Sequence, residues 1–130
     1  MYLRLIALIS LGSLTISCKE ECRRNIYKIQ EAGYRLVPKS GYNVKFFLKA
    51  GDSIYITSKA LEGNTIDLIC FSNSIYLTKG IGKPIACSEN IPEINWKFHI
   101  IEAGEYAVYI RNNSDEFKKY YLNTYYVRCE

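Results

Sequence analysis

The sequence has little of what catalytic and metal-binding sites require. Its 130 residues include one histidine, His99, and five cysteines, none in the Cys-x2-Cys spacing typical of zinc sites. It contains no glycine-rich phosphate loop and no calcium loop of spaced Asp and Asn residues. Strand alternation places His99 outward, with no Ser or Cys at a recognisable turn to act as a nucleophile beside it. We therefore expect a non-enzymatic protein that uses no cofactor and no metal.

The chain also lacks a strong excess of either charge. Lys and Arg number 17 against 13 Asp and Glu, a formal net charge of +4. This balance is too small and too evenly spread for a nucleic-acid partner bound through a basic patch. The acidic residues show no pair suited to glycoside hydrolysis. Asp52, Glu102 and Glu105 fall at turns and Asp115-Glu116 in a polar segment, so we expect these carboxylates to be solvated.

No apolar run is long enough to span a bilayer, which takes about 20 residues. The longest lies at the start of the chain, where Arg4 precedes a stretch of roughly a dozen mostly apolar residues. A short positive region followed by such a stretch is typical of a signal peptide. We expect residues 1–17 to be this signal peptide and residues 18–24 to form a tether to a domain at 25–130.

The residues that follow the apolar run indicate lipid attachment. Leu14-Thr15-Ile16-Ser17-Cys18 resembles a bacterial lipobox, which implies that Cys18 is lipidated and becomes the mature N-terminus. Lys19-Glu20-Glu21 resembles the export tag of surface lipoproteins in Bacteroidota, which implies an outer-membrane location with surface exposure. The membrane is then one partner, held through the lipid. The alternative stays open, because Thr15 and Ser17 also fit ordinary signal peptidase cleavage before Cys18, which gives a secreted soluble protein.

Cysteine parity favours the lipoprotein. If Cys18 carries lipid, Cys22, Cys70, Cys87 and Cys129 remain, and four thiols can pair completely. In an oxidising compartment they are expected to form two disulfides, with three possible connectivities. We expect Cys70–Cys87 and Cys22–Cys129, since this choice joins neighbours in sequence and ties one end of the chain to the other.

The mature chain reads as one all-β domain. Aromatic residues and Ile outnumber strong helix formers, and short runs of period-two alternation are separated by Gly, Asn and Ser. The clearest predicted strands are Val44–Lys49, Ser53–Thr57, Thr65–Phe71, Ile75–Thr78, Trp96–Ile101, Glu105–Arg111 and Tyr120–Cys129, with weaker candidates at Asn25–Gln30 and Tyr34–Val37.

Alternation also assigns the inward face of each predicted strand. The inward stripes are Val44, Phe46 and Leu48; Ile54 and Ile56; Ile66, Leu68 and Cys70; Trp96, Phe98 and Ile100; Tyr106, Val108 and Ile110. A single open sheet cannot bury this many one-sided stripes, whereas two facing sheets can. We predict a disulfide-stapled, two-sheet antiparallel β-sandwich of the jelly-roll-like kind.

Two segments, Phe47–Ile56 and Trp96–Asn112, share a strand, an Ala-Gly-acidic turn and a following alternating strand. Together they resemble GOLD-type (emp24-like) domains and the pre-peptidase C-terminal domains of secreted bacterial proteins, over about a fifth of the chain. The resemblance implies an antiparallel β-sandwich that acts as a binding or accessory module. It supplies no catalytic residue.

The 12 tyrosines cannot all face the core. We expect Tyr55, Tyr109, Tyr121 and Tyr125 to be exposed and to bind a ligand, because tyrosine presents an apolar body with a polar rim to proteins and sugars. The predicted function is that of a non-catalytic envelope lipoprotein, a binding or accessory module that contacts protein or glycan. The alternative is a structural or assembly component that pairs through an edge strand.

Overall fold

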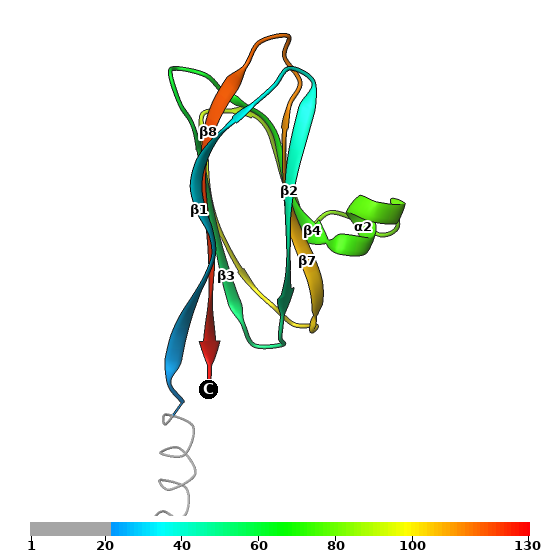
Figure 1. Ribbon diagram of the computed structural model, residues 1–130. Helices are drawn as coiled ribbons and strands as arrows, with labels where there is room; N and C mark the ends of the chain where they lie inside the picture. Colours follow the sequence, from blue (N-terminus) through cyan, green and yellow to red (C-terminus); the bar gives the residue numbers. More distant parts are fainter. Residues whose placement is uncertain (1–21) are drawn as a thin grey trace, which may run out of the picture.

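A computed structural model describes residues 22–130 of the chain (Figure 1). The predicted signal peptide (1–17), the lipidation site Cys18 and residues 18–21 of the tether lie outside the described residues. In the described part, no helix has the length and hydropathy needed to cross a membrane.

Eight strands and one short helix make up the domain. They are β1 (Arg24–Leu36), β2 (Ser40–Leu48), β3 (Ser53–Ala60), β4 (Ile66–Asn73), α2 (Ser74–Lys79), β5 (Ala86–Ile91), β6 (Glu93–His99), β7 (Gly104–Asn112) and β8 (Lys118–Cys129). One antiparallel sheet has the order β1-β8-β3-β6 and the other the order β2-β7-β4-β5. The two sheets face each other with α2 projecting from one side (Figure 1). The predicted two-sheet antiparallel sandwich is confirmed.

The core lies between the sheets and follows the predicted alternation in most strands. Ile54 and Ile56 from β3, and Val108 and Ile110 from β7, are fully or almost fully buried. The side chains between them in β3 are only half-buried, because successive residues of a strand point to opposite faces. Aromatic rings fill the space that these aliphatic side chains leave, with Phe71 at the centre of the aromatic group.

Two predicted strands are parts of one strand in the structure. Asn25–Gln30 and Tyr34–Val37, except Val37 itself, belong to the long strand β1, which has a bulge between Lys28 and Gln30. That extra residue shifts the alternation along β1, so the two halves look like separate strands in the sequence. Strand β5 was not predicted at all, because it is a polar edge strand in which no residue is fully buried.

The predicted strand at Ile75–Thr78 is wrong, because this segment forms helix α2. The Asn73 side chain caps the helix by accepting a hydrogen bond from the backbone N–H of Ile75 at 2.9 Å. Gly80 ends it in the left-handed conformation, with φ of 68°, and donates its N–H to the Tyr76 carbonyl. These two caps set the length of the helix.

The predicted inward stripe of Ile66, Leu68 and Cys70 is also wrong in part. Ile66 joins the core as predicted, but the next core residues along β4 are Ile69 and Phe71. β4 is buried on both faces, since Cys70 and Ser72 are also inaccessible. Alternation does not fix the orientation of a strand that carries apolar residues on both sides.

Two disulfides hold the sandwich. Cys22 pairs with Cys129, with the two Cα atoms 5.4 Å apart, and Cys70 pairs with Cys87 directly opposite it on β5. This connectivity is the expected one. Beside the first disulfide, Arg23 exchanges two backbone hydrogen bonds with Glu130. Residues 22–24, assigned to the tether from the sequence, therefore lie against the end of β8.

One acidic side chain expected to be solvated is buried. Asp52 is only 1% exposed and forms a bidentate ion pair with Arg128, at 3.0 Å from Nε and 2.9 Å from Nη2. Its Oδ2 also accepts the backbone N–H of Lys49 at 2.7 Å, which closes the Ala-Gly turn between β2 and β3. The partner that buries Asp52 comes from the far end of the sequence.

Candidate functional site

The outer face of the β1-β8-β3-β6 sheet brings together three of the four predicted binding tyrosines. Tyr125 on β8 lies directly opposite Tyr55 on the neighbouring strand β3. Lys97 on β6 is the partner of Tyr55 on its other side, and Lys28 on β1 is the partner of Tyr125. The order across all four strands is therefore Lys28, Tyr125, Tyr55, Lys97, which we call the tyrosine row.

The two rings of the tyrosine row stand parallel and stacked, with centroids 4.9 Å apart and an interplanar angle of 7°. The Lys97 ammonium lies 5.3 Å from the centroid of the Tyr55 ring. Because β3 lies between β8 and β6, this ammonium flanks the face of Tyr55 that is turned away from Tyr125. Both faces of the Tyr55 ring are thus occupied, which leaves the ring edge and the hydroxyl as the parts open to a partner.

Polar side chains surround the tyrosine row. Lys28 forms an ion pair with Glu31 at 2.7 Å, and the hydrogen bond and the charge of the ammonium lower the pKa of the Glu31 carboxyl. Asn123 and Thr57 lie opposite each other in the next row along the sheet. Tyr121, also on β8, is the exposed one of the three phenols, whereas Tyr55 and Tyr125 were expected to be exposed and are half-buried. This face combines aromatic edges, amides, hydroxyls and cations in one plane.

The fourth predicted tyrosine, Tyr109, lies elsewhere. It belongs to β7, in the other sheet, with its ring against Gly41 of β2, so that a Cβ atom on Gly41 would lie 2.6 Å from the Tyr109 hydroxyl. Arg111 donates a hydrogen bond to the same hydroxyl at 3.2 Å. Alternation predicts whether a side chain points outward but not from which sheet, so the sequence grouped tyrosines from two faces.

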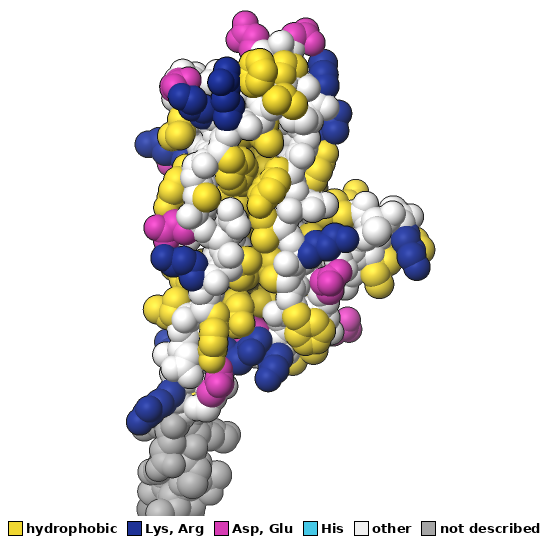
Figure 2. Space-filling view, viewed as in Figure 1, with side chains coloured by type: hydrophobic (Ala, Val, Ile, Leu, Met, Phe, Trp, Pro, Cys, Tyr) yellow, Lys and Arg dark blue, Asp and Glu magenta, His cyan; other side chains and the backbone are white. Residues whose placement is uncertain are grey.

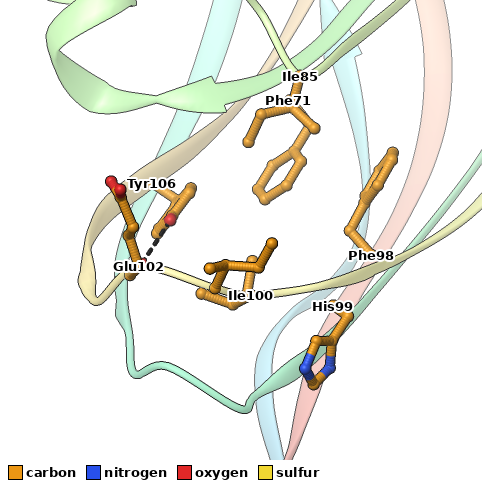
Figure 3. Close-up of a pocket in the computed structure, with 8 residues that line it drawn as sticks. Phe71, Ile85, Phe98, His99, Ile100, Glu102 and Tyr106 are labelled. Carbon is orange, nitrogen blue, oxygen red and sulfur yellow. Dashed lines mark hydrogen bonds between the residues drawn. The ribbon is translucent and has the colours of Figure 1, made fainter.

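A second candidate site is an apolar pocket of about 350 Å³ that reaches the core near the loop between β6 and β7 (Figure 3). Its walls come from Phe71, Ile85, Phe98, His99, Ile100, Ile101, Glu102 and Tyr106. Tyr106 donates its hydroxyl hydrogen to the Glu102 carbonyl at 2.6 Å, shown dashed in Figure 3. Strand alternation does not reveal this pocket, because Ile85 lies outside every predicted strand.

Most of the side chains that line this pocket are apolar. His99 lies at its rim, and none of the described residues that line it is a serine, threonine or cysteine that could serve as a nucleophile. Within residues 22–130, no group of three or more His, Cys, Asp and Glu side chains is placed to hold a metal ion.

Comparison with known proteins supports the fold and no narrower relationship. No family model matches the chain, and no curated protein matches its sequence. Among solved structures it is similar to the Yersinia pseudotuberculosis-derived mitogen YPM, at 16% identity and a TM-score of 0.55 over 78% of this chain and 86% of that one.

It is also similar to PliG of Aeromonas hydrophila, a periplasmic inhibitor of g-type lysozyme, at 9% identity and a TM-score of 0.52, covering 85% of this chain and 90% of PliG. TmCBM61, solved in complex with β-1,4-galactotriose, matches at 8% identity and a TM-score of 0.50, over 85% and 90% of the two chains. At these identities the shared property is the β-sandwich, which is also the fold that the GOLD-type and pre-peptidase resemblance implied.

Proposed function

We propose that this protein is a non-catalytic binding module of the bacterial cell envelope, exported and anchored by lipid at Cys18, and that its tyrosine row contacts a protein partner. The two disulfides support an oxidising compartment, since such bonds persist outside the cytosol. The observation that carries the binding proposal is the row Lys28, Tyr125, Tyr55, Lys97 across the outer face of one sheet.

The arrangement of the rings favours a protein over a glycan. A sugar stacks on a free aromatic face, but Tyr125 and Lys97 flank the two faces of the Tyr55 ring. Tyrosine is enriched at protein interfaces, where the ring edge packs against the partner and the hydroxyl finds a polar group. Stacking also restricts both rings before binding, so less side-chain entropy is lost when a partner docks.

The test compares two variants that carry the same kind of substitution on opposite faces. Tyr55→Ser/Tyr125→Ser removes the row, and Tyr109→Ser removes a half-buried phenol from the other sheet. Wild type and both variants are immobilised and exposed to solubilised envelope proteins of the bacterium that makes this protein. The same three proteins are applied to a glycan array. We expect a stoichiometric partner that binds wild type and Tyr109→Ser, and whose affinity for the double variant falls at least about 30-fold, the loss typical of interface hot spots.

Two results would contradict this proposal. Glycan binding that only the double variant abolishes would change the ligand class. A partner that binds all three proteins equally would place the contact elsewhere, for example on an edge strand.

The anchor is tested separately, by the intact mass of the protein extracted from membranes. We expect a mature chain that begins at Cys18 and carries added acyl mass, and a Cys18→Ala variant that no longer fractionates with membranes. A chain without acyl mass would support the secreted alternative.

A further inference from the structure

The end of the sandwich at which β1 begins and β8 ends has a distinct surface, which we call the terminal end. Ile26, Val127, Ser53 and His99 form one row across the β1-β8-β3-β6 sheet close to this end. Beyond the row lie the β2–β3 turn, residues 49–52, and the β6–β7 loop, residues 100–103. Two backbone hydrogen bonds tie these segments together: the N–H of Gly51 donates to the Ile100 carbonyl, and the N–H of Ile100 to the Asp52 carbonyl. In Figure 1 β1 begins at this end and the C-terminus lies beside its start.

The terminal end exposes aliphatic side chains to an unusual degree. Ile101 is 81% exposed and Ile26 is 71% exposed, the two highest values among the large hydrophobic residues of the described part. They come from the β6–β7 loop and from the opposite edge strand. Three strand spacings separate Ile26 from His99, about 14 Å. Ile26 lies on the outer face of the sheet, on the same side as Lys28, whereas Ile101 lies in the loop beyond the strands and is the apolar contact point of the end itself.

Cations accompany these isoleucines. Arg23, Arg24 and Lys49 are all exposed at the same end. The exposed acidic side chains there are Glu102, Glu105 and Glu130, while Asp52 is neutralised by its pairing with Arg128. In Figure 2, Lys and Arg side chains lie beside hydrophobic ones next to the N-terminal segment. Exposed aliphatic residues flanked by Lys and Arg are typical of surfaces that lie in a membrane interface.

Chain length brings this end to the membrane. Four residue steps separate Cys18 from Cys22, and a fully extended chain of that length spans at most about 14 Å. The disulfide between Cys22 and Cys129 fixes where that span enters the domain. A lipid on Cys18 thus holds Cys22 within about 14 Å of the acyl boundary, roughly the thickness of two headgroup layers.

We propose that the terminal end rests on a lipid surface, with Arg23, Arg24 and Lys49 among the headgroups and the exposed Ile101 of the β6–β7 loop in the interface. This inference rests on the lipid attachment proposed above. The sandwich then stands upright, because the twelve residues of β8 run away from this end for about 40 Å. The loop that precedes β8 projects from the membrane, and the tyrosine row faces sideways, accessible to a partner.

The test measures depth in the bilayer with a single tryptophan. The one natural tryptophan is replaced (Trp96→Phe), and a new one is placed at the terminal end (Ile101→Trp) or, as a matched control, at the far end (Phe117→Trp). Position 117 is also exposed and hydrophobic, and it directly precedes β8. The lipidated full chains are reconstituted into phosphatidylglycerol/phosphatidylethanolamine vesicles with or without acyl-brominated lipid. We expect bromolipid to reduce the fluorescence at position 101 about twofold, because an interfacial side chain reaches the acyl boundary, and to leave position 117 unchanged.

Other results would show whether the proposed orientation or the proposed lipid anchor is wrong. Protein that co-sediments with vesicles but is quenched equally at both positions, or at neither, overturns the orientation and leaves the lipid anchor standing. Protein that neither co-sediments nor carries acyl mass overturns the anchor, and the orientation with it. A charge-reversed chain, Arg23→Glu/Arg24→Glu/Lys49→Glu in the Ile101→Trp background, should show weaker quenching. Unchanged quenching in that chain would contradict the role assigned to the cations.

Discussion

Replacing Asp52 by Asn should destabilise the domain by about 3 kcal/mol at neutral pH, the lower part of the range for breaking a buried ion pair. The Asp52 carboxylate is almost inaccessible and accepts hydrogen bonds from Arg128 and from the backbone of Lys49. An amide of the same shape has one oxygen and one NH2 group. Its NH2 group would face one of these donors, and the guanidinium would lose its counter-charge where its own side chain is only 16% exposed.

The pKa of Asp52 gives this prediction a pH dependence. Burial alone would raise the pKa, but the hydrogen bonds from Arg128 and Lys49 and the charge of the guanidinium together lower it. A carboxyl whose pKa is lower in the folded than in the unfolded state stabilises the fold above the unfolded value, about 3.9. That contribution disappears as the pH falls through the folded-state pKa.

The assay is thermal and urea unfolding of wild type and Asp52→Asn, followed by circular dichroism with both disulfides intact. A loss of about 3 kcal/mol corresponds to a melting temperature lower by roughly 12 °C in a domain of this size. Measured at a series of pH values from 7 down to 2, the difference between the two proteins should be largest near neutrality and shrink below about pH 4.

The matched control is Glu31→Gln, which removes the exposed ion pair with Lys28 and should leave the stability close to that of wild type. The prediction is contradicted if the free energy of unfolding of Asp52→Asn at pH 7 lies within about 1 kcal/mol of the wild-type value, because a loss that small is typical of an exposed ion pair. It also fails if the difference in stability is the same at pH 7 and pH 2.

Three further variants test a buried amide and the two disulfides. Asn112→Ala should lower the free energy of unfolding in urea by about 3 kcal/mol. The fully buried amide of Asn112 donates hydrogen bonds to three backbone carbonyls, which would lose this donor. A loss under about 1 kcal/mol, the value of a single ordinary hydrogen bond, would contradict the prediction. Opening the Cys22–Cys129 disulfide, whose cysteines are 107 residues apart, by Cys22→Ser/Cys129→Ser should lower the free energy of unfolding by about 4.7 kcal/mol. Opening the Cys70–Cys87 disulfide, with a separation of 17, by Cys70→Ser/Cys87→Ser should lower it by about 3 kcal/mol. The reverse order in guanidinium unfolding would show that loop entropy does not set their contributions.

Strand alternation predicted most of the fold because most strands bury one face only. In β8, Tyr120 and Leu122 are fully buried while Tyr121 between them is exposed, as the period of two requires. The same rule failed in β4, where both faces are covered. It failed again at Ile75–Thr78, because a short apolar run fits a strand and a buried helix equally. The informative residues there were the two caps, Asn73 and Gly80.

Burial of Asp52 was not predictable for a different reason. The Ala-Gly-Asp turn was recognised, but a turn residue is ordinarily solvated, and the side chain that pairs with Asp52 lies 76 residues later in the sequence. Only the adjacency of β3 and β8 brings Arg128 to the turn. The pairing of Cys22 with Cys129 was easier to predict, since four cysteines allow only three connectivities, whereas thirteen acidic and seventeen basic residues allow far too many pairs.

The tyrosine row shows the same limit at the functional surface. Alternation identified Tyr55, Tyr109 and Tyr125 as outward-facing, but whether two outward side chains meet depends on which strands are neighbours. β3 and β8 are adjacent in space and far apart in sequence, whereas β7 lies in the opposite sheet. The stacking of Tyr55 on Tyr125 and the position of Lys97 over the remaining ring face both follow from that order. The preference for a protein partner over a sugar therefore depends on the topology of the sheet, since the tyrosine content alone is compatible with both.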